Sequence, residues 1–140
     1  MTDTLTALRV VLPLCPAREL SPNAREHWAS KARAVKTMRR AAWACAHETL
    51  NGERPMLTGP VLVDATIGWA KGRKTVDPDN AVAMLKSAID GLTDAGLWAN
   101  DREVTVVVGS QATWGSMGAA TQALYPAGFI TLDVYPGGTP

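Results

Sequence analysis

The sequence predicts a single α+β domain over residues 1–140, with a mixed β-sheet of about four strands and two long helices packed on it. Two observations predict this fold. Four short segments are rich in β-branched residues, and two longer segments repeat apolar residues at helical spacing. Of the 140 residues, 46% are hydrophobic and 19% charged, which is enough apolar material for one core and too much for a disordered chain.

The elements are expected in the order strand, helix, strand, helix, strand, strand. Strand segments lie at 5–14, 61–70, 103–114 and 128–136. The connection 115–127 is rich in small residues and fits either a flexible loop or a short hairpin tip. One mixed sheet with both helices on one face would bury the apolar side of each helix.

The first helix is expected to begin at Asn23, which forms a capping-box pattern with Glu26, and to run to about Thr49. Its outer face is basic. Its apolar arc is expected to enter the core. The members of this arc are Trp28, Ala32, Val35, Met38, Ala42, Cys45 and Ala46.

The second helix is expected over Asn80–Ala95, with Asp79 as its N-cap and Gly96 at its C-terminal end. Counting 100° per residue places Ala83, Lys86 and Asp90 on the same face as Asp79. An ion pair between Lys86 and Asp90 is expected at this i,i+4 spacing. The opposite, buried stripe is expected to contain Val82, Leu85, Ile89 and Leu92.

Four of the five tryptophans are assigned to one of two environments. Trp28, Trp69 and Trp98 are expected in the core. Trp43 lies on the basic side of the first helix, so it is expected outside, where an aromatic ring could stack on a nucleobase. His27 is expected to be structural or exposed to solvent.

Positive charge is concentrated in the first half of the chain, although the net charge is only +1. A second basic stretch runs directly into Asp77. This distribution is expected if a phosphate backbone passes an acidic centre, while solvated surface helices are the alternative. The candidate nucleic-acid contacts are Arg25, Arg33, Lys36, Arg40, Lys71, Arg73 and Lys74.

The two cysteines, Cys15 and Cys45, follow no metal-ligand spacing and are expected to be free thiols. The N-terminal apolar run is interrupted by Arg9 and Pro13, so it predicts neither a signal peptide nor a membrane span. The sequence therefore predicts a cytoplasmic protein.

Asp77 and Asp79 flank Pro78 at the start of the second helix, and Asp101 precedes the third strand. Asp-Pro-Asp-Asn by itself fits a capped surface helix. Three carboxylates without a histidine or thiolate cluster instead favour Mg²⁺, with Mn²⁺ as a possible substitute. Such a cation beside a basic surface is typical of phosphodiester hydrolysis.

The predicted length of the second helix limits how Asp101 can join the other aspartates. A helix of 16 residues is about 24 Å long, whereas the five residues 96–100 span at most about 18 Å. Asp101 therefore completes the site in its own chain only if the helix is shorter or the return is oblique. Otherwise it completes the site of a partner chain.

The segments "SPNAREHWASKARAVK" and "DPDNAVAMLKSAIDGLTDAGLWANDREV" resemble the RusA family of Holliday junction resolvases, including phage and prophage versions. The resemblance covers most of the chain. It implies a small homodimeric, Mg²⁺-dependent endonuclease that nicks four-way DNA junctions symmetrically. Two departures exist: Asn100-Asp101 replaces two adjacent acids, and the segment from Asn80 to Lys86 is longer than in the shortest members.

The resemblance also implies roles for individual residues. Asp77, Asp79 and Asp101 would hold one or two Mg²⁺ ions, and a bound water would be the nucleophile. Lys86 would support the charged phosphate or position a carboxylate, and the basic residues would contact the DNA backbone. Two other functions stay open: a non-catalytic dimer that binds branched DNA, and a nuclease for other branched or flap DNA.

Overall fold

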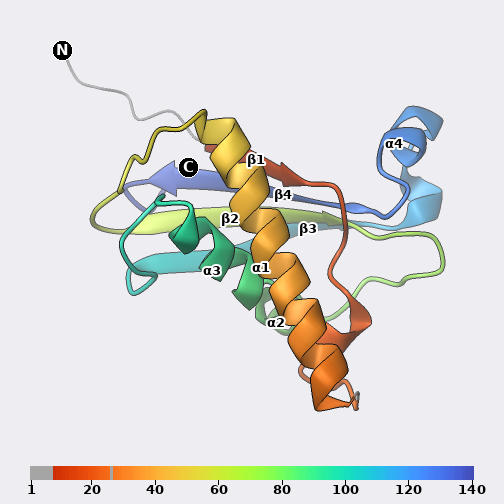
Figure 1. Cartoon of the computed structure of the whole chain (residues 1–140). Coiled ribbons are helices and arrows are strands. Elements are labelled where there is room, and N and C mark those ends of the chain that lie inside the picture. The colour runs from red at the N-terminus through yellow and green to blue at the C-terminus, as the bar shows by residue number, and fades with distance from the viewer. Residues whose placement is uncertain (1–7, 26) are drawn as a thin grey trace.

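The computed structural model describes residues 8–25 and 27–140 and contains one four-stranded mixed sheet with helices against it (Figure 1). The strands are β1 (Leu8–Leu12), β2 (Val61–Gly68), β3 (Val104–Ala112) and β4 (Phe129–Pro136). Their order in the sheet is β1-β4-β2-β3. β4 pairs antiparallel with β1 and β2, and β3 pairs parallel with β2. The predicted α+β class and mixed sheet are therefore confirmed.

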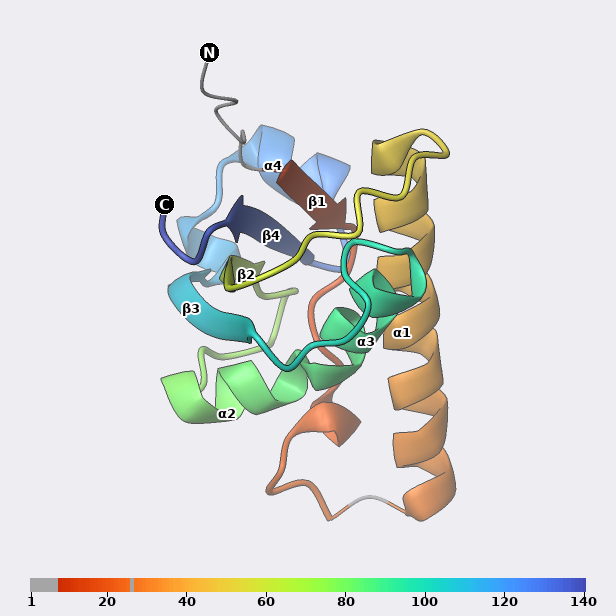
Figure 2. The same ribbon diagram turned by 90° about the vertical axis from the view of Figure 1, so that its left-hand side faces the viewer.

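The core lies on one side of this sheet. In β2 the alternating residues Val61, Val63, Ala65 and Ile67 are buried, as the two-residue period of a strand requires. Helices α1 (Trp28–Leu50) and α3 (Lys86–Asp94) pack on this side, and α2 (Pro78–Met84) contacts β3 (Figure 2). The sheet therefore has one face packed against helices, with Trp69 and Trp98 buried as predicted.

The start of α1 differs from the prediction. The helix begins at Trp28, and the side chain of His27 caps it by accepting a hydrogen bond from the amide of Ala29 at 3.2 Å. Asn23 lies before the helix in a turn, and its predicted capping partner Glu26 lies outside the described residues. The segment without Pro or Gly is therefore longer than the helix itself.

The predicted apolar arc of α1 is buried only in part. Met38, Ala42 and Ala46 are in the core, whereas Trp28 is 75% exposed and Val35 is 43% exposed. The reason is the position at which α3 crosses α1. Gly91 of α3 lies so close to α1 that a Cβ there would overlap the carbonyl oxygen of Arg39. The prediction of a core position for Trp28 was wrong because α3 packs against the later turns of α1.

The second helix is divided in two. α2 ends at Met84 and α3 begins at Lys86, with Leu85 between them at φ −94° and ψ −2°. The N-cap position belongs to Asp77, and Asp79 lies in the first turn. Met84 and Leu85 are both buried at this break. No Pro or Gly marks this break, and the expectation of one continuous helix was wrong.

The connection 115–127 is neither an open loop nor a hairpin tip. It contains a short 3-10 helix, η2 (Trp114–Ser116), and a helix, α4 (Ala119–Leu124). Another 3-10 helix, η1 (Arg18–Leu20), lies between β1 and α1. Across residues 8–25 and 27–140, the helices are too short or too polar to span a bilayer.

Candidate functional site

Lys86 joins two carboxylates that are distant from each other in the sequence. Its ammonium donates to Asp90 Oδ1 at 2.9 Å, one turn further along α3. It also donates to Asp101 Oδ2 at 2.7 Å, from the loop before β3. The predicted ion pair between Lys86 and Asp90 is confirmed. Lys86, Asp90 and Asp101, hereafter the Lys86 cluster, thus bring α3 and the 99–103 loop together.

Lys86 and Asp101 stabilise each other's charged forms. The hydrogen bond and the charge of Lys86 lower the pKa of Asp101. The hydrogen bonds from Lys86 to Asp101 and then to Asp90 raise the pKa of Lys86. Each direction favours the charged form of the group concerned. All three side chains remain partly exposed, with Lys86 at 65%, so solvent can still compete for them.

Asp77 and Asp79 form a second acidic group at the start of α2. Asp77 is the N-cap residue, and its side chain makes no capping hydrogen bond. Pro78 occupies the first helical position, where its missing amide has no consequence and its fixed φ favours helix. Both carboxylates are exposed.

A glutamine that sequence reasoning missed holds the chain directly before Asp77. The side chain of Gln111 accepts from the amide of Val76 at 3.0 Å and donates to the carbonyl of Val76 at 2.8 Å. The same oxygen accepts from the indole of Trp69 at 2.8 Å. Gln111 therefore fixes the approach of the chain to the two aspartates.

A β-bulge explains why Gln111 faces this way. The register of β2 and β3 shifts between Ala65 and Thr66, so Gln111 pairs with Ile67, whose side chain is buried in the core. The extra residue is Gly109, and its amide donates to Asp64 Oδ1 at 3.1 Å. A Cβ at Gly109 would overlap this carboxylate. An isolated glycine in a strand pattern is the signal that could have predicted the bulge.

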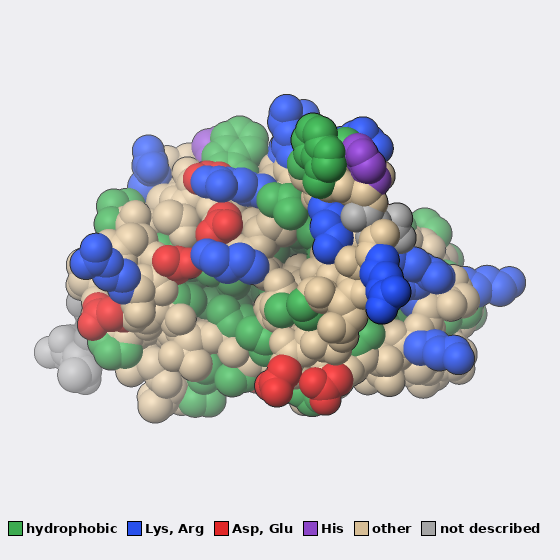
Figure 3. Space-filling model, turned by 90° about the horizontal axis from the view of Figure 1, so that it is seen from below, with side chains coloured by type: hydrophobic (Ala, Val, Ile, Leu, Met, Phe, Trp, Pro, Cys, Tyr) green, Lys and Arg blue, Asp and Glu red, His purple; other side chains and the backbone are tan. Residues whose placement is uncertain are grey.

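The two acidic groups do not merge in one chain. Asp79 lies in α2, and Asp101 contacts Lys86 of α3. Within residues 8–25 and 27–140, no three His, Cys, Asp or Glu side chains are grouped as a metal site requires. Figure 3 likewise shows the acidic side chains of one face in separate groups.

The surroundings of these carboxylates determine which of them can bind a divalent cation. Carboxylate oxygens are suitable ligands for Mg²⁺, which is usually bound by one or two carboxylates together with substrate phosphates and water. Asp77 and Asp79 fit this pattern because they are exposed and make no side-chain hydrogen bond among the described residues. Asp101 fits it less well in a single chain, because the ammonium of Lys86 already binds its carboxylate.

The basic residues before Asp77 fall into two kinds. Lys71 and Lys74 are exposed in the 69–77 loop. Arg73 is half-buried, with its guanidinium over the ring of Trp69 at 4.9 Å and one nitrogen 3.7 Å from Cys15 Sγ. Burial lowers the pKa of Arg73. Arg73 therefore attaches this loop to the core, whereas both lysines are free to meet a ligand.

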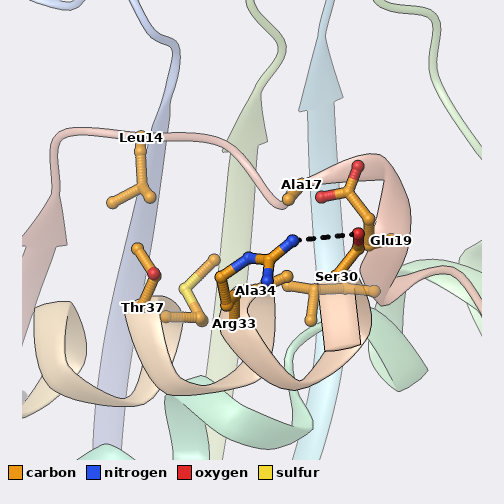
Figure 4. A pocket seen from close by; sticks show the side chains of 9 residues that line it. Leu14, Ala17, Glu19, Ser30, Arg33, Ala34 and Thr37 are labelled. Carbon is orange, nitrogen blue, oxygen red and sulfur yellow. Dashed lines mark hydrogen bonds between the residues drawn. The ribbon is translucent and has the colours of Figure 1, made fainter. Parts of the chain in front are cut away.

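The basic residues near α1 also differ from one another. Arg25 is exposed before the helix, and Lys36 and Arg40 project from its outer side. Arg33 donates to Ser30 Oγ at 3.2 Å and lines a cavity of about 380 Å³ between α1 and the 14–20 segment. Figure 4 shows Arg33 rising into this cavity from α1 and Glu19 coming from the 14–20 segment opposite. Arg33 also borders a second hollow of α1 together with Lys36 and Arg40.

Comparisons with known proteins show no family for this chain. No protein-family model matches it, and no curated protein matches it. Among solved structures, one similar chain is the periplasmic domain of Helicobacter pylori MotB, at 12% identity and a TM-score of 0.38. The match covers 98% of this chain and 86% of that one. Such a TM-score is too low to indicate a common function or a common fold.

Proposed function

We propose that this protein is a Mg²⁺-dependent endonuclease that acts on branched DNA, with the four-way junction as its substrate and a homodimer as its working form. The observation that carries the proposal is the contact between Lys86 and Asp101 at 2.7 Å. These two residues belong to the progression Asp77, Asp79, Lys86, Asp101 and are separated by 15 positions. The residues that the RusA resemblance singles out therefore include two that meet in space.

Different exposed residues would contribute to phosphodiester hydrolysis in different ways. Asp77 and Asp79 would hold Mg²⁺, which when bound polarises the scissile phosphate and stabilises the leaving oxygen. Lys71 and Lys74 lead into these aspartates and would draw the DNA backbone towards them. Lys86 would partly offset the charge of Asp101 and Asp90 while a phosphate passes. Contacts of this kind position DNA without reading its sequence.

The test is nicking of a synthetic four-way junction in Mg²⁺, with and without EDTA, by the wild type and by Asp79→Asn. We expect nicking that requires Mg²⁺ and is lost in Asp79→Asn, while junction binding is retained. The matched control is Glu53→Gln, which changes another exposed carboxylate, far from α2 in the sequence. Nicking by Asp79→Asn at the wild-type rate would refute the assignment of the metal site.

A second candidate function is a dimer that binds branched DNA without cleaving it. The Lys86 cluster favours it, because an internal ammonium pairs with both Asp90 and Asp101 without any metal ion. Junction binding without turnover in either Mg²⁺ or Mn²⁺ would support this candidate over the nuclease. Preferential cleavage of a flap over a junction would instead identify a nuclease for other branched DNA.

A further inference from the structure

One face of α1 carries a row of cationic and aromatic side chains that the acidic groups do not use. Lys36, Arg40, Trp43 and His47 are spaced by four, three and four positions, which places them on one side of the helix. Trp43 is 42% exposed. Its ring stacks on that of His47, with centroids 5.2 Å apart and planes 13° apart. We call this set the α1 row.

The surface beside the α1 row is hollowed. One hollow of about 500 Å³ is bounded by Lys36, Arg40 and the small residue Ala44. Another of about 400 Å³ is bounded by Lys36, Arg40 and Trp43. The hollows share the two cations, so a ligand in either one meets both. In Figure 3 large hydrophobic, histidine and basic side chains gather along the rim that α1 forms.

The α1 row keeps its positive charge. Lys36 and Arg40 have no carboxylate within 4.0 Å among the described residues. Asp94 borders the second hollow, but Arg39 binds it through two hydrogen bonds of 2.6 and 2.9 Å. This contact lowers the pKa of Asp94 and offsets its charge. Among the described residues that line the two hollows, the one acid is Asp94, whose charge Arg39 offsets.

Cations in a row with an exposed flat ring at its end match the chemistry of single-stranded nucleic acid. Phosphates pair with the cations, and a base stacks on the ring irrespective of its identity. A duplex offers phosphates but no free base face, because its bases already stack on one another. The ring of Trp43 therefore adds affinity only where bases are unpaired.

We propose that the α1 row binds bases that unpair where the arms of the branched DNA substrate meet, with Trp43 stacking on one such base and with Lys36 and Arg40 contacting phosphates of the same strand. This inference rests on the proposed function, since it names the part of the branched substrate that α1 engages. It assigns to Trp43 a binding role without a part in the chemistry.

The test is the anisotropy of a fluorescent single-stranded oligonucleotide and of a duplex of the same sequence, titrated with protein in EDTA so that no turnover occurs. Trp43→Leu is expected to weaken single-strand binding about tenfold or more and to leave duplex binding nearly unchanged. Trp43→Phe should retain most of the affinity. Trp28→Leu is the matched control, since it removes another exposed tryptophan of α1 and should change neither affinity.

A separate variant tests the cations of the α1 row. Lys36→Gln combined with Arg40→Gln should weaken binding to both DNA forms and reduce the salt slope of single-strand binding by about 1.4, because each cation that pairs with a phosphate adds about 0.7 to that slope. An unchanged slope would remove these two residues from the interface. A Trp28→Leu effect equal to that of Trp43→Leu would overturn the assignment of the row.

The remaining outcomes separate this inference from the proposed function. Full single-strand affinity in Trp43→Leu would overturn the inference and leave the nuclease untouched. Selective loss of single-strand affinity in Trp43→Leu, in a protein that nicks no junction, would support the inference while the nuclease fails. Conversion of a dimer to a monomer by Trp43→Leu, measured by sedimentation, would show that a second copy occupies this face and would overturn the inference.

Discussion

The two acidic groups along α2 and α3 differ in where their counter-charge comes from. In the Lys86 cluster the fold itself supplies a cation, and one ammonium binds Asp90 and Asp101 at 2.9 and 2.7 Å. At the start of α2, Asp77 and Asp79 have no such partner among the described residues. An added cation gains most where the charge is still uncompensated, so Asp77 and Asp79 are the stronger candidates for binding Mg²⁺.

The largest expected effect comes from neutralising an aspartate at the start of α2, and it is compared with neutralising an aspartate of the Lys86 cluster. Asp77→Asn should lower Mg²⁺-dependent nicking by about 10²–10³, the usual reduction when a group that stabilises transition-state charge is removed. Asp90→Asn should lower it by less than about tenfold, because Lys86 still binds Asp101. Initial rates on the same junction give the comparison. Equal reductions in the two variants would contradict the distinction between the groups.

The next largest effect is expected from Gln111, which fixes the chain directly before Asp77 and Asp79. Gln111→Leu removes the partner of the Trp69 indole and of both backbone groups of Val76. Unpaired polar groups of this kind cost about 1–3 kcal/mol each when water cannot replace the partner. We expect the free energy of unfolding to fall by about 2–3 kcal/mol in urea titrations.

The same variant should affect the two acidic groups unequally. Because Val76 directly precedes Asp77, nicking by Gln111→Leu should fall even at temperatures where the variant is fully folded. The Lys86 cluster should be retained, and the pKa of Asp101 measured by NMR should stay low. Gln122→Leu, which removes a single hydrogen bond to the carbonyl of Trp114, is a control for the generic removal of a glutamine amide. An ordinary pKa of Asp101 in Gln111→Leu would mean that Gln111 supports the whole region.

Periodic features of the sequence predicted the fold well. Strands with alternating apolar residues lie at the predicted places, and the i,i+4 spacing of Lys86 and Asp90 predicted their ion pair. These features depend on neighbours within a few residues, which the sequence displays directly. The position of Asp101 required more, because a loop length bounds how far a chain can return and does not fix where it arrives.

Other features depended on contacts that no local pattern encodes. The break at Leu85 lies between buried residues and is marked by no helix breaker in the sequence. Trp28 lies outside because α3 crosses α1 near Arg39 and leaves the first turn uncovered. Gln111 reaches Val76 only because a bulge shifts the register between β2 and β3, and the pairing of two strands that are distant in the sequence decides that register.

A smaller effect should follow from removing the internal cation. Lys86→Gln leaves Asp90 and Asp101 close together without an ammonium between them. Because these side chains are partly exposed, the free energy of unfolding should fall by no more than about 1 kcal/mol. The pKa of Asp101, followed by NMR, should rise to the ordinary range or above it.

In Lys86→Gln, Asp90 and Asp101 lack a counter-charge among the described residues, as Asp77 and Asp79 do in the wild type. Added Mn²⁺ should then broaden the NMR signals near Asp101 in the variant more than in the wild type. Lys71→Gln, an exposed lysine elsewhere, is the control and should change neither the pKa nor the broadening. Equal broadening in wild type and Lys86→Gln would show that the ammonium does not compete with a divalent cation.

The smallest effect is the pH dependence of the Lys86 cluster. Because the pKa of Asp101 is lower in the folded chain, its contact with Lys86 stabilises the fold above the ordinary aspartate value of about 3.9. That stabilisation disappears as the pH falls through the lowered pKa. The raised pKa of Lys86 has the opposite sign, so its contribution is complete below about 10.4 and disappears as the pH rises through the raised value.

The difference in unfolding free energy between wild type and Asp101→Asn should therefore be constant near neutral pH and shrink towards zero in acid. It should amount to a few tenths of a kcal/mol, because water screens exposed pairs. In a Lys86→Gln background, Asp101→Asn should show no comparable acid-dependent difference, since no ammonium remains from which acid could separate Asp101. An acid-dependent difference of the same size in that background would mean that Lys86 does not compensate Asp101, and the contrast between the two acidic groups would fail.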